Sequence, residues 1–201
     1  MARHQRGLSL IGRIAALMLI VTVVAAACDN GSGQNGSGEN GSGDAAATLD
    51  EALADHVAGR IDEARQGYLD VLDLEPDDSF ALYNLGLIAQ NESDLTTAQD
   101  FYRRSLAVDP DFEAAVFNLA IVEAQLDNPD EAIDLYQQII EINPENAGAH
   151  LNLGFLYLEL GKEKKGNNEL QRAIKLDPSL SDRIVSPKGA ASEEPSSEPS
   201  E

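Results

Sequence analysis

The sequence has one cysteine, no tryptophan and few basic residues. Its 201 residues include 14 lysines and arginines against 35 aspartates and glutamates, which gives a formal net charge of −21 at pH 7. A field of this sign repels phosphate backbones and anionic lipid headgroups, so it argues against a nucleic-acid-binding protein. A single cysteine excludes an intramolecular disulfide. Aromatic residues make up only 5% of the chain, which favours small helical units over a large enzyme core.

The single cysteine, Cys28, follows a segment typical of export signals. Arg3, Arg6 and Arg13 are followed by an apolar run over 14–24 and three alanines over 25–27. The run is short for a membrane span, which needs about 20 residues, but it suits the core of a signal peptide. Residues 1–27 are therefore predicted to be a signal peptide.

This segment resembles a prokaryotic lipoprotein signal, in which the thiol is diacylated and the cysteine becomes the new N-terminus. The resemblance implies lipid attachment at Cys28 and a location on the outer face of the cell membrane. That family usually has Leu three residues before the cysteine, whereas this chain has Ala25. The three alanines also suit ordinary signal cleavage, which would give a secreted protein, and an uncleaved anchor is a third reading.

Two segments of biased composition flank the central region. Residues 28–44 contain the cysteine and three copies of Asn-Gly-Ser-Gly, which is typical of a flexible linker. Residues 181–201 are expected to form a short cap followed by a disordered tail rich in Pro, Ser and Glu. The folded domain is therefore expected over 45–180.

A 34-residue period runs through the central region. Prolines recur at this interval, at Pro76, Pro110, Pro144 and Pro178. A small residue stands twelve positions before each proline, as Ala64, Ala98, Ala132 and Gly166. A large one stands eight positions before, as Tyr68, Tyr102, Tyr136 and Leu170. A fixed period of this length indicates stacked helical repeats.

These spacings resemble the tetratricopeptide repeat, in which Leu-Gly, then Ala-x3-aromatic, then Pro mark each unit. The resemblance implies an all-α fold, a right-handed superhelix of four helix-turn-helix units over 45–78, 79–112, 113–146 and 147–180. Helices are expected near 47–58, 61–73, 80–91, 95–107, 114–126, 129–141, 148–160 and 163–175. The turns within the units are expected at Gly59, Ser93, Asp127 and Gly161.

In this family the first helix of each unit lines a concave groove. That placement implies a stripe of amides, Asn84, Asn118 and Asn152, which could pair with the backbone of an extended peptide. Apolar neighbours on the same helices complete the expected groove: Phe80, Tyr83, Leu87, Phe117, Ile121 and Phe155. The alternative for the amides is that they cap local groups or face water. These positions carry no Lys or Arg, which argues against a clamp for C-terminal carboxylates.

Other polar residues fit structural roles. His150 stands at a packing position and is expected in the core, and the lysines of 162–165 are expected on a solvated face. No arrangement typical of a catalytic site, cofactor or metal site is present. Leu180 and Ile184 are expected to fold back over the last helix, although a second copy of the chain could cover that end instead.

The sequence therefore predicts a membrane-tethered scaffold that binds a basic or neutral partner protein or extended peptide and is not an enzyme. A permanent subunit of a cell-envelope complex, held through the repeat edges, is the first alternative. An enzyme of unknown type is the second. A monomer is expected rather than a homodimer, because two copies of so acidic a chain repel each other.

Overall fold

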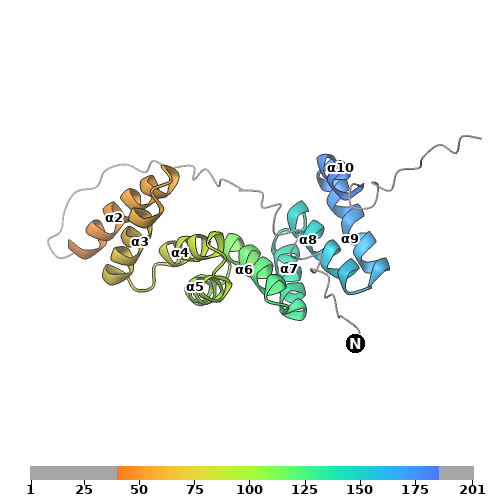
Figure 1. Ribbon diagram of the computed structural model, residues 1–201, viewed down its shortest axis with the longest axis horizontal. Coiled ribbons are helices and arrows are strands. Elements are labelled where there is room, and N and C mark those ends of the chain that lie inside the picture. Colours follow the sequence, from red (N-terminus) through yellow and green to blue (C-terminus); the bar gives the residue numbers. More distant parts are fainter. Residues whose placement is uncertain (1–39, 186–201) are drawn as a thin grey trace, which may run out of the picture. The chain divides into compact units, whose positions relative to one another are not determined.

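A computed structural model describes residues 40–185, and all regular structure in that range is helical (Figure 1). The elements are α2 (Asn40–Val57), α3 (Ile61–Leu74), α4 (Ser79–Asn91), α5 (Leu95–Val108), α6 (Glu113–Gln125), α7 (Pro129–Ile142), α8 (Ala147–Glu159), α9 (Glu163–Leu176), the 3-10 turn η2 (Pro178–Leu180) and α10 (Ser181–Val185). None of the helices in this range is long and apolar enough to cross a membrane. Cys28, the expected signal peptide, most of the expected linker and the acidic tail lie outside the described residues.

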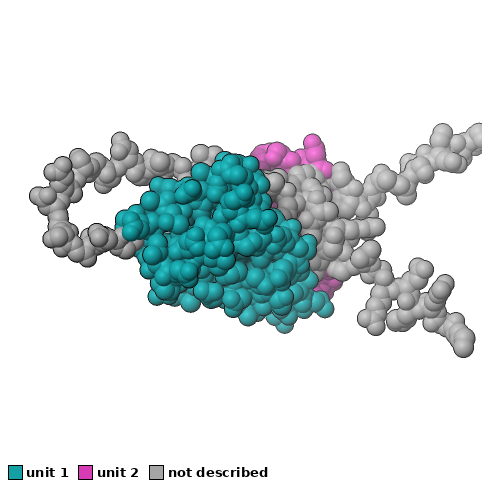
Figure 2. Space-filling view, turned by 60° about the vertical axis from the view of Figure 1, so that its left-hand side comes forward, with its two compact units in different colours: residues 1–135 teal, residues 136–201 magenta. Residues whose placement is uncertain are grey.

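The helices pair as antiparallel hairpins, α2 with α3, α4 with α5, and α8 with α9. α6 packs Leu119 and Val122 against Leu135 of α7 in the same way. Of the described residues, those up to Leu135 form one compact unit and those from Tyr136 form a second, shown in separate colours in Figure 2. This arrangement confirms the predicted all-α class of helix-turn-helix units.

The helix bounds agree closely with those expected from the sequence. From α3 to α9 every helix begins and ends within one residue of its predicted position. The first helix is different, because α2 begins at Asn40 and not at 47. It therefore takes in the end of the segment expected as linker over 28–44. The addition is about two helical turns. Alanines at 45–47 favour helix, and Ala45 is 2% exposed, so the added part is buried at Ala45.

The turn within each hairpin contains one residue in the left-handed region. Its φ is 76° at Gly59, 65° at Ser93, 64° at Asp127 and 70° at Gly161. These are the four turn positions predicted from the sequence, and each occupies the same place in its repeat. Glycine adopts this conformation without strain, whereas Ser93 pays a steric cost because its Cβ crowds the backbone.

The prolines end the second helices as expected. The residue before a proline avoids the helical region, and Glu75, Asp109 and Asp177 have φ of −131°, −126° and −132° with ψ of 86°, 91° and 97°. At α4 and α8 the helix that follows the proline starts from a capping side chain. Asp78 Oδ1 accepts from Ala81 N at 2.6 Å, and Asn146 Oδ1 accepts from Ala149 N at 2.9 Å.

The small and large residues of each hairpin fit together as predicted. Ala98 and Tyr102 are fully buried on α5, and Tyr102 lies against Gly86 of α4. A Cβ built on Gly86 would come within 2.6 Å of the Tyr102 ring, so only glycine allows this approach. Gly154 of α8 and Gly166 of α9 meet in the same way, because a Cβ on Gly166 would lie 2.8 Å from the Gly154 carbonyl oxygen.

The C-terminal end is covered by the chain itself. Leu180 is 6% exposed and packs with Leu151, Leu170 and Ala173, and Ile184 of α10 packs against the same cluster. The expectation that this short segment folds back over the last helix is therefore confirmed.

Candidate functional site

The first helices of the central hairpins carry few charges. α4 has none, whereas its partner α5 has Asp100, Arg103 and Arg104. A helix without a charged face either lies in a core or has an apolar surface for a partner. One side of α4 is buried, and the remaining apolar side chains, Phe80, Tyr83 and Leu87, are partly exposed.

The same stripe recurs on α6, where Phe117, Asn118 and Ile121 are partly exposed. The exposed positions of α4 follow the spacing i, i+3 and i+7, which places them on one side of a helix. Because α4 and α6 contact each other, the two stripes form one continuous surface. We call it the α4–α6 face: Phe80, Tyr83, Leu87, Phe117, Asn118 and Ile121. All six residues were predicted from the sequence as groove residues.

Three aromatic rings meet at one end of this face. The centroids of Tyr83 and Phe112 are 4.8 Å apart, those of Phe80 and Phe112 are 6.2 Å apart, and those of Phe80 and Tyr83 are 6.3 Å apart. The Phe80 and Phe112 rings are nearly parallel, at 11°, whereas Tyr83 is tilted against both by 43–46°. We call Phe80, Tyr83 and Phe112 the aromatic cluster; it links α4 to the residue that precedes α6.

Phe112 is the member that sequence reasoning missed, although a signal for it was present. It stands at the N-cap of α6, the place that the capping residues Asp78 and Asn146 take in the neighbouring repeats. A phenyl ring cannot accept a hydrogen bond from the backbone, and α6 has no side-chain cap bond. Replacing a polar cap by an apolar residue typically costs about 1 kcal/mol. A repeat with an aromatic ring in place of this capping bond departs from the usual preference for polar N-cap residues, and such departures are often found at functional sites.

Tyr83 is held from two sides. Asn118 Nδ2 donates to its hydroxyl oxygen at 3.2 Å, and the centroid of the Tyr102 ring lies 5.9 Å from its own. Burial raises the pKa of the Tyr83 phenol, while the bond from Asn118 lowers it by a smaller amount. The phenol is therefore neutral at physiological pH, and its ring has a fixed orientation.

The amide stripe is tied into the repeats rather than open to solvent. Asn84 is 5% exposed, and its Nδ2 donates to the Phe80 carbonyl oxygen of its own helix at 2.8 Å. Asn118 bonds Tyr83, and Asn152 forms a side-chain hydrogen bond with Tyr136. For these amide groups the structure shows the local bonding that was the alternative interpretation. Asn118 and Asn152 are still partly exposed, whereas Asn84 is not.

The last repeat differs from the central ones. Leu151, which stands at the position of Tyr83 and Phe117, is 7% exposed and packs under Leu180. Phe155, predicted as a groove residue, packs against the same cluster as Ile184. In the last repeat the cap therefore covers positions whose equivalents on α4 and α6 are partly exposed.

The buried charges of the central repeats are structural. Glu123 is fully buried, and its carboxylate accepts from Gln99 at 2.7 Å, from Arg103 at 3.0 Å and from Asn128 at 2.8 Å. Arg103 also pairs with Glu131 at 2.8 Å, a bond that raises the pKa of the guanidinium. Sequence reasoning did not find this network, because Gln99 and Arg103 of α5 reach Glu123 from 24 and 20 residues away in the chain.

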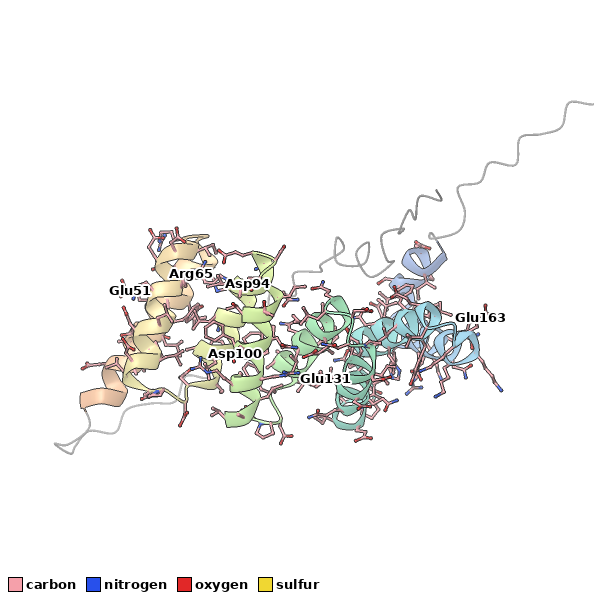
Figure 3. The ribbon with its side chains drawn as sticks, turned by 60° about the horizontal axis from the view of Figure 1, so that its bottom comes forward. Glu51, Arg65, Asp94, Asp100, Glu131 and Glu163 are labelled. Carbon is pink, nitrogen blue, oxygen red and sulfur yellow. The ribbon has the colours of Figure 1, made fainter. Side chains whose placement is uncertain are left out.

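The outer surfaces are acidic in both units. Exposed carboxylates are spread over the helices, as the labelled side chains in Figure 3 show for Glu51, Asp94, Asp100, Glu131 and Glu163. Hydrogen bonds from Thr97 lower the pKa of Asp94, so it is fully charged at neutral pH. Within residues 40–185 no three His, Cys, Asp or Glu side chains are placed to hold a metal ion.

His150 lies in the core, as expected. It is 6% exposed, its Nδ1 lies 2.7 Å from Glu169 Oε2, and its Nε2 lies 3.2 Å from the Pro144 carbonyl oxygen. The lysines at the start of α9 are exposed, and the ammonium groups of Lys162 and Lys165 lie 5.7 and 5.3 Å from the centre of the Tyr157 ring.

Two family models described as tetratricopeptide repeat match the chain, one at residues 83–147 and the other at residues 123–184. The fold is similar to the crystal structure of MamA, with a TM-score of 0.63 and 20% identity over 69% of this chain and 81% of that one. It is also similar to YrrB, described as a TPR protein with an unusual peptide-binding site, with a TM-score of 0.63 and 17% identity over 72% of this chain and 78% of that one. For pilF of Pseudomonas aeruginosa the TM-score is 0.61 at 19% identity, over 70% of this chain and 64% of that one. No sequence among the curated proteins matches the chain.

Proposed function

We propose that this chain, whose residues 83–184 contain tetratricopeptide repeats, is a scaffold that binds another protein along the α4–α6 face. The main observation in support is that this face is partly exposed although it is almost wholly apolar. A surface of apolar and aromatic side chains rimmed by charge is typical of protein interaction sites. The likeness to YrrB, a TPR protein with a peptide-binding site, supports an extended peptide as the bound form.

Charge sets the chemistry of the partner. The chain has a formal net charge of −21 and no Lys or Arg on α4 or α6, so acidic segments are repelled and basic or neutral ones are favoured. The apolar positions Leu87 and Ile121 would receive side chains of an extended segment, while the exposed rim carboxylates would steer its approach.

A second function has one observation in its favour. Leu74, Val108 and Ile142 occupy the same position in successive repeats, at the ends of the second helices, and are 48%, 42% and 47% exposed. A repeated exposed apolar position supports a stable contact through the repeat edges, as a permanent subunit of an envelope complex would need.

Site-specific photocrosslinking in cells tests both proposals. We expect a benzoylphenylalanine at Leu87 to capture a partner, and one at Leu69, an exposed leucine of α3, to capture none. Capture at Val108 but not at Leu87 would favour the edge contact. No capture at either position would overturn the scaffold proposal, since a stable partner must lie within reach of one of them.

We also propose that the scaffold is tethered to the outer face of the prokaryotic cell membrane through lipid on Cys28. Support comes from the sequence, where the single cysteine directly follows a signal-like segment. Two acyl chains anchor a protein stably, whereas one chain binds only marginally. Cys28→Ala should therefore release a folded protein from the membrane fraction. Retention of a variant with a cleaved signal after a salt wash would refute lipid tethering, whereas retention of an uncleaved chain would indicate a signal anchor. Neither outcome bears on the binding face.

A further inference from the structure

We infer that the aromatic cluster is a binding site for a basic side chain, Arg or Lys, of the partner peptide. The inference rests on the proposed function, and it assigns a chemistry to one place on the α4–α6 face. Three rings with fixed mutual geometry, all partly exposed, come together from α4 and the start of α6. Aromatic faces attract cations through their negative π surfaces, most strongly where water is partly excluded.

The local charge is complementary to a cation. Asp77 and Asp78 closely precede Phe80, and Asp111 and Glu113 flank Phe112 in the chain. The Asp78 carboxylate is fixed at the N-terminus of α4, where it accepts from Ala81 N. Carboxylates this close to the rings in the chain would attract a cationic side chain and repel a carboxylate ligand.

The chain supplies few cations of its own to these rings. Between Arg65 and Lys162 the sequence has only Arg103 and Arg104. Arg103 is bound by Glu123 and Glu131, and Arg104 lies over the Phe101 ring, 5.4 Å from its centre. Neither is therefore available to the cluster.

The absence of a side-chain cap at α6 also supports a binding role for the aromatic cluster. Phe112 stands where Asp78 and Asn146 cap the neighbouring helices, so a ring here is not needed for the fold of a repeat. Tyr83 is oriented by the bond from Asn118, which pre-organises the cluster for a ligand and reduces the ordering cost of binding.

The test uses three nine-residue peptides, Ser-Gly-Ala-Ser-X-Ser-Ala-Gly-Ser with blocked ends, where X is Arg, citrulline or Glu. Citrulline keeps the shape of Arg without its charge. They are titrated into the purified full-length protein in buffered salt solution, and the NMR signals of the aromatic rings are followed. We expect the Arg peptide to bind about five- to tenfold more tightly than the citrulline peptide, and the Glu peptide to bind least.

Two variants separate the cluster from the general acidity of the protein. Phe112→Leu keeps an apolar side chain but removes the ring, so this variant should bind the Arg and citrulline peptides about equally well. Phe101→Leu removes a ring of α5 outside the cluster and should keep the preference. Circular dichroism checks that both variants are folded.

Each other outcome overturns the inference in a distinct way. Equal binding of the Arg and citrulline peptides would remove the cation preference but leave the face as a peptide site. A preference that survives in Phe112→Leu would assign it to the overall field instead of the cluster. If none of the three peptides shifts a ring signal, recognition of a basic side chain here is wrong, and crosslinking at Leu87 reports separately on the scaffold.

Discussion

Truncating Leu180 should destabilise the last repeat, because this side chain is the main apolar cover of the C-terminal end. Leu180 is 6% exposed and packs with Leu151, Leu170 and Ala173. Leu180→Ala removes three carbons, each worth about 0.8 kcal/mol when buried, so the lost transfer free energy is about 2.4 kcal/mol. The added cavity cost should be small, since a short terminal segment can collapse into the space, and we expect a total loss of about 2–3 kcal/mol.

The loss can be seen in two measurements. For a domain of this size about 1 kcal/mol shifts the melting temperature by about 2–4 °C, so a global effect would lower it by about 5–10 °C. Repeat arrays can also unfold from one end, in which case the loss appears first in the amide exchange of α9. Leu74→Ala is the matched control, because Leu74 is 48% exposed and the same truncation should cost only about half as much.

The reasoning fails if Leu180→Ala leaves both the urea midpoint and the amide protection of α9 unchanged. It also fails if Leu74→Ala costs as much as Leu180→Ala. Sedimentation of the variant gives a further check, since a cap that no longer covers Leu170 should promote self-association.

Three other substitutions give predictions of defined sign. Ser93→Gly should stabilise the protein by about 0.5–1 kcal/mol in urea unfolding, because φ at this turn is 65° and glycine removes the steric cost. His56→Gln should keep a partner for the Tyr68 hydroxyl and flatten the fall in stability between pH 7 and pH 5. Burial lowers the pKa of His56 in the folded chain below its ordinary value of 6.5. As the pH falls below 6.5 the unfolded chain therefore takes up a proton before the folded chain does, and the free energy of unfolding decreases. Asn118→Ala should cost about 0.5–1.5 kcal/mol, and much less in a Tyr83→Phe background, which a double-mutant cycle by urea unfolding measures. An effect of Asn118→Ala that is equal in both backgrounds would show that the amide does not act through Tyr83.

The sequence contained enough to predict the hairpins, because each signal is local and repeated. Proline fixes where a second helix ends, and a left-handed residue fixes each turn, so one misplaced element would break the register of the repeats. The start of α2 was missed because its Asn-Gly-Ser-Gly composition is typical of linkers, whereas the burial of Ala45 depends on tertiary packing.

The choice of side-chain hydrogen-bond partners limited the prediction of the binding face. The position of Asn84 in a repeat does not reveal that its amide turns back to the Phe80 carbonyl oxygen. Nor does the position of Asn118 reveal that its amide reaches Tyr83 in the preceding repeat. The tyrosine partners also vary between repeats, since the Tyr68 hydroxyl meets His56 and the Tyr102 hydroxyl donates to Gln90. These choices depend on side-chain geometry, which a repeating pattern does not encode.

The near-identical backbone angles before the prolines have a consequence for how this protein can change in length over evolution. Glu75 and Asp109 leave their helices in the same direction, with φ of −131° and −126°, so residues 79–112 begin and end at equivalent joints. A duplication or deletion of one whole repeat between such joints would preserve every turn and every helix contact type. An insertion of another length would rotate the next helix away from its partner. The protein can therefore gain or lose binding surface in whole repeats, and a duplicated segment would carry its own copies of Phe80, Tyr83 and Phe112.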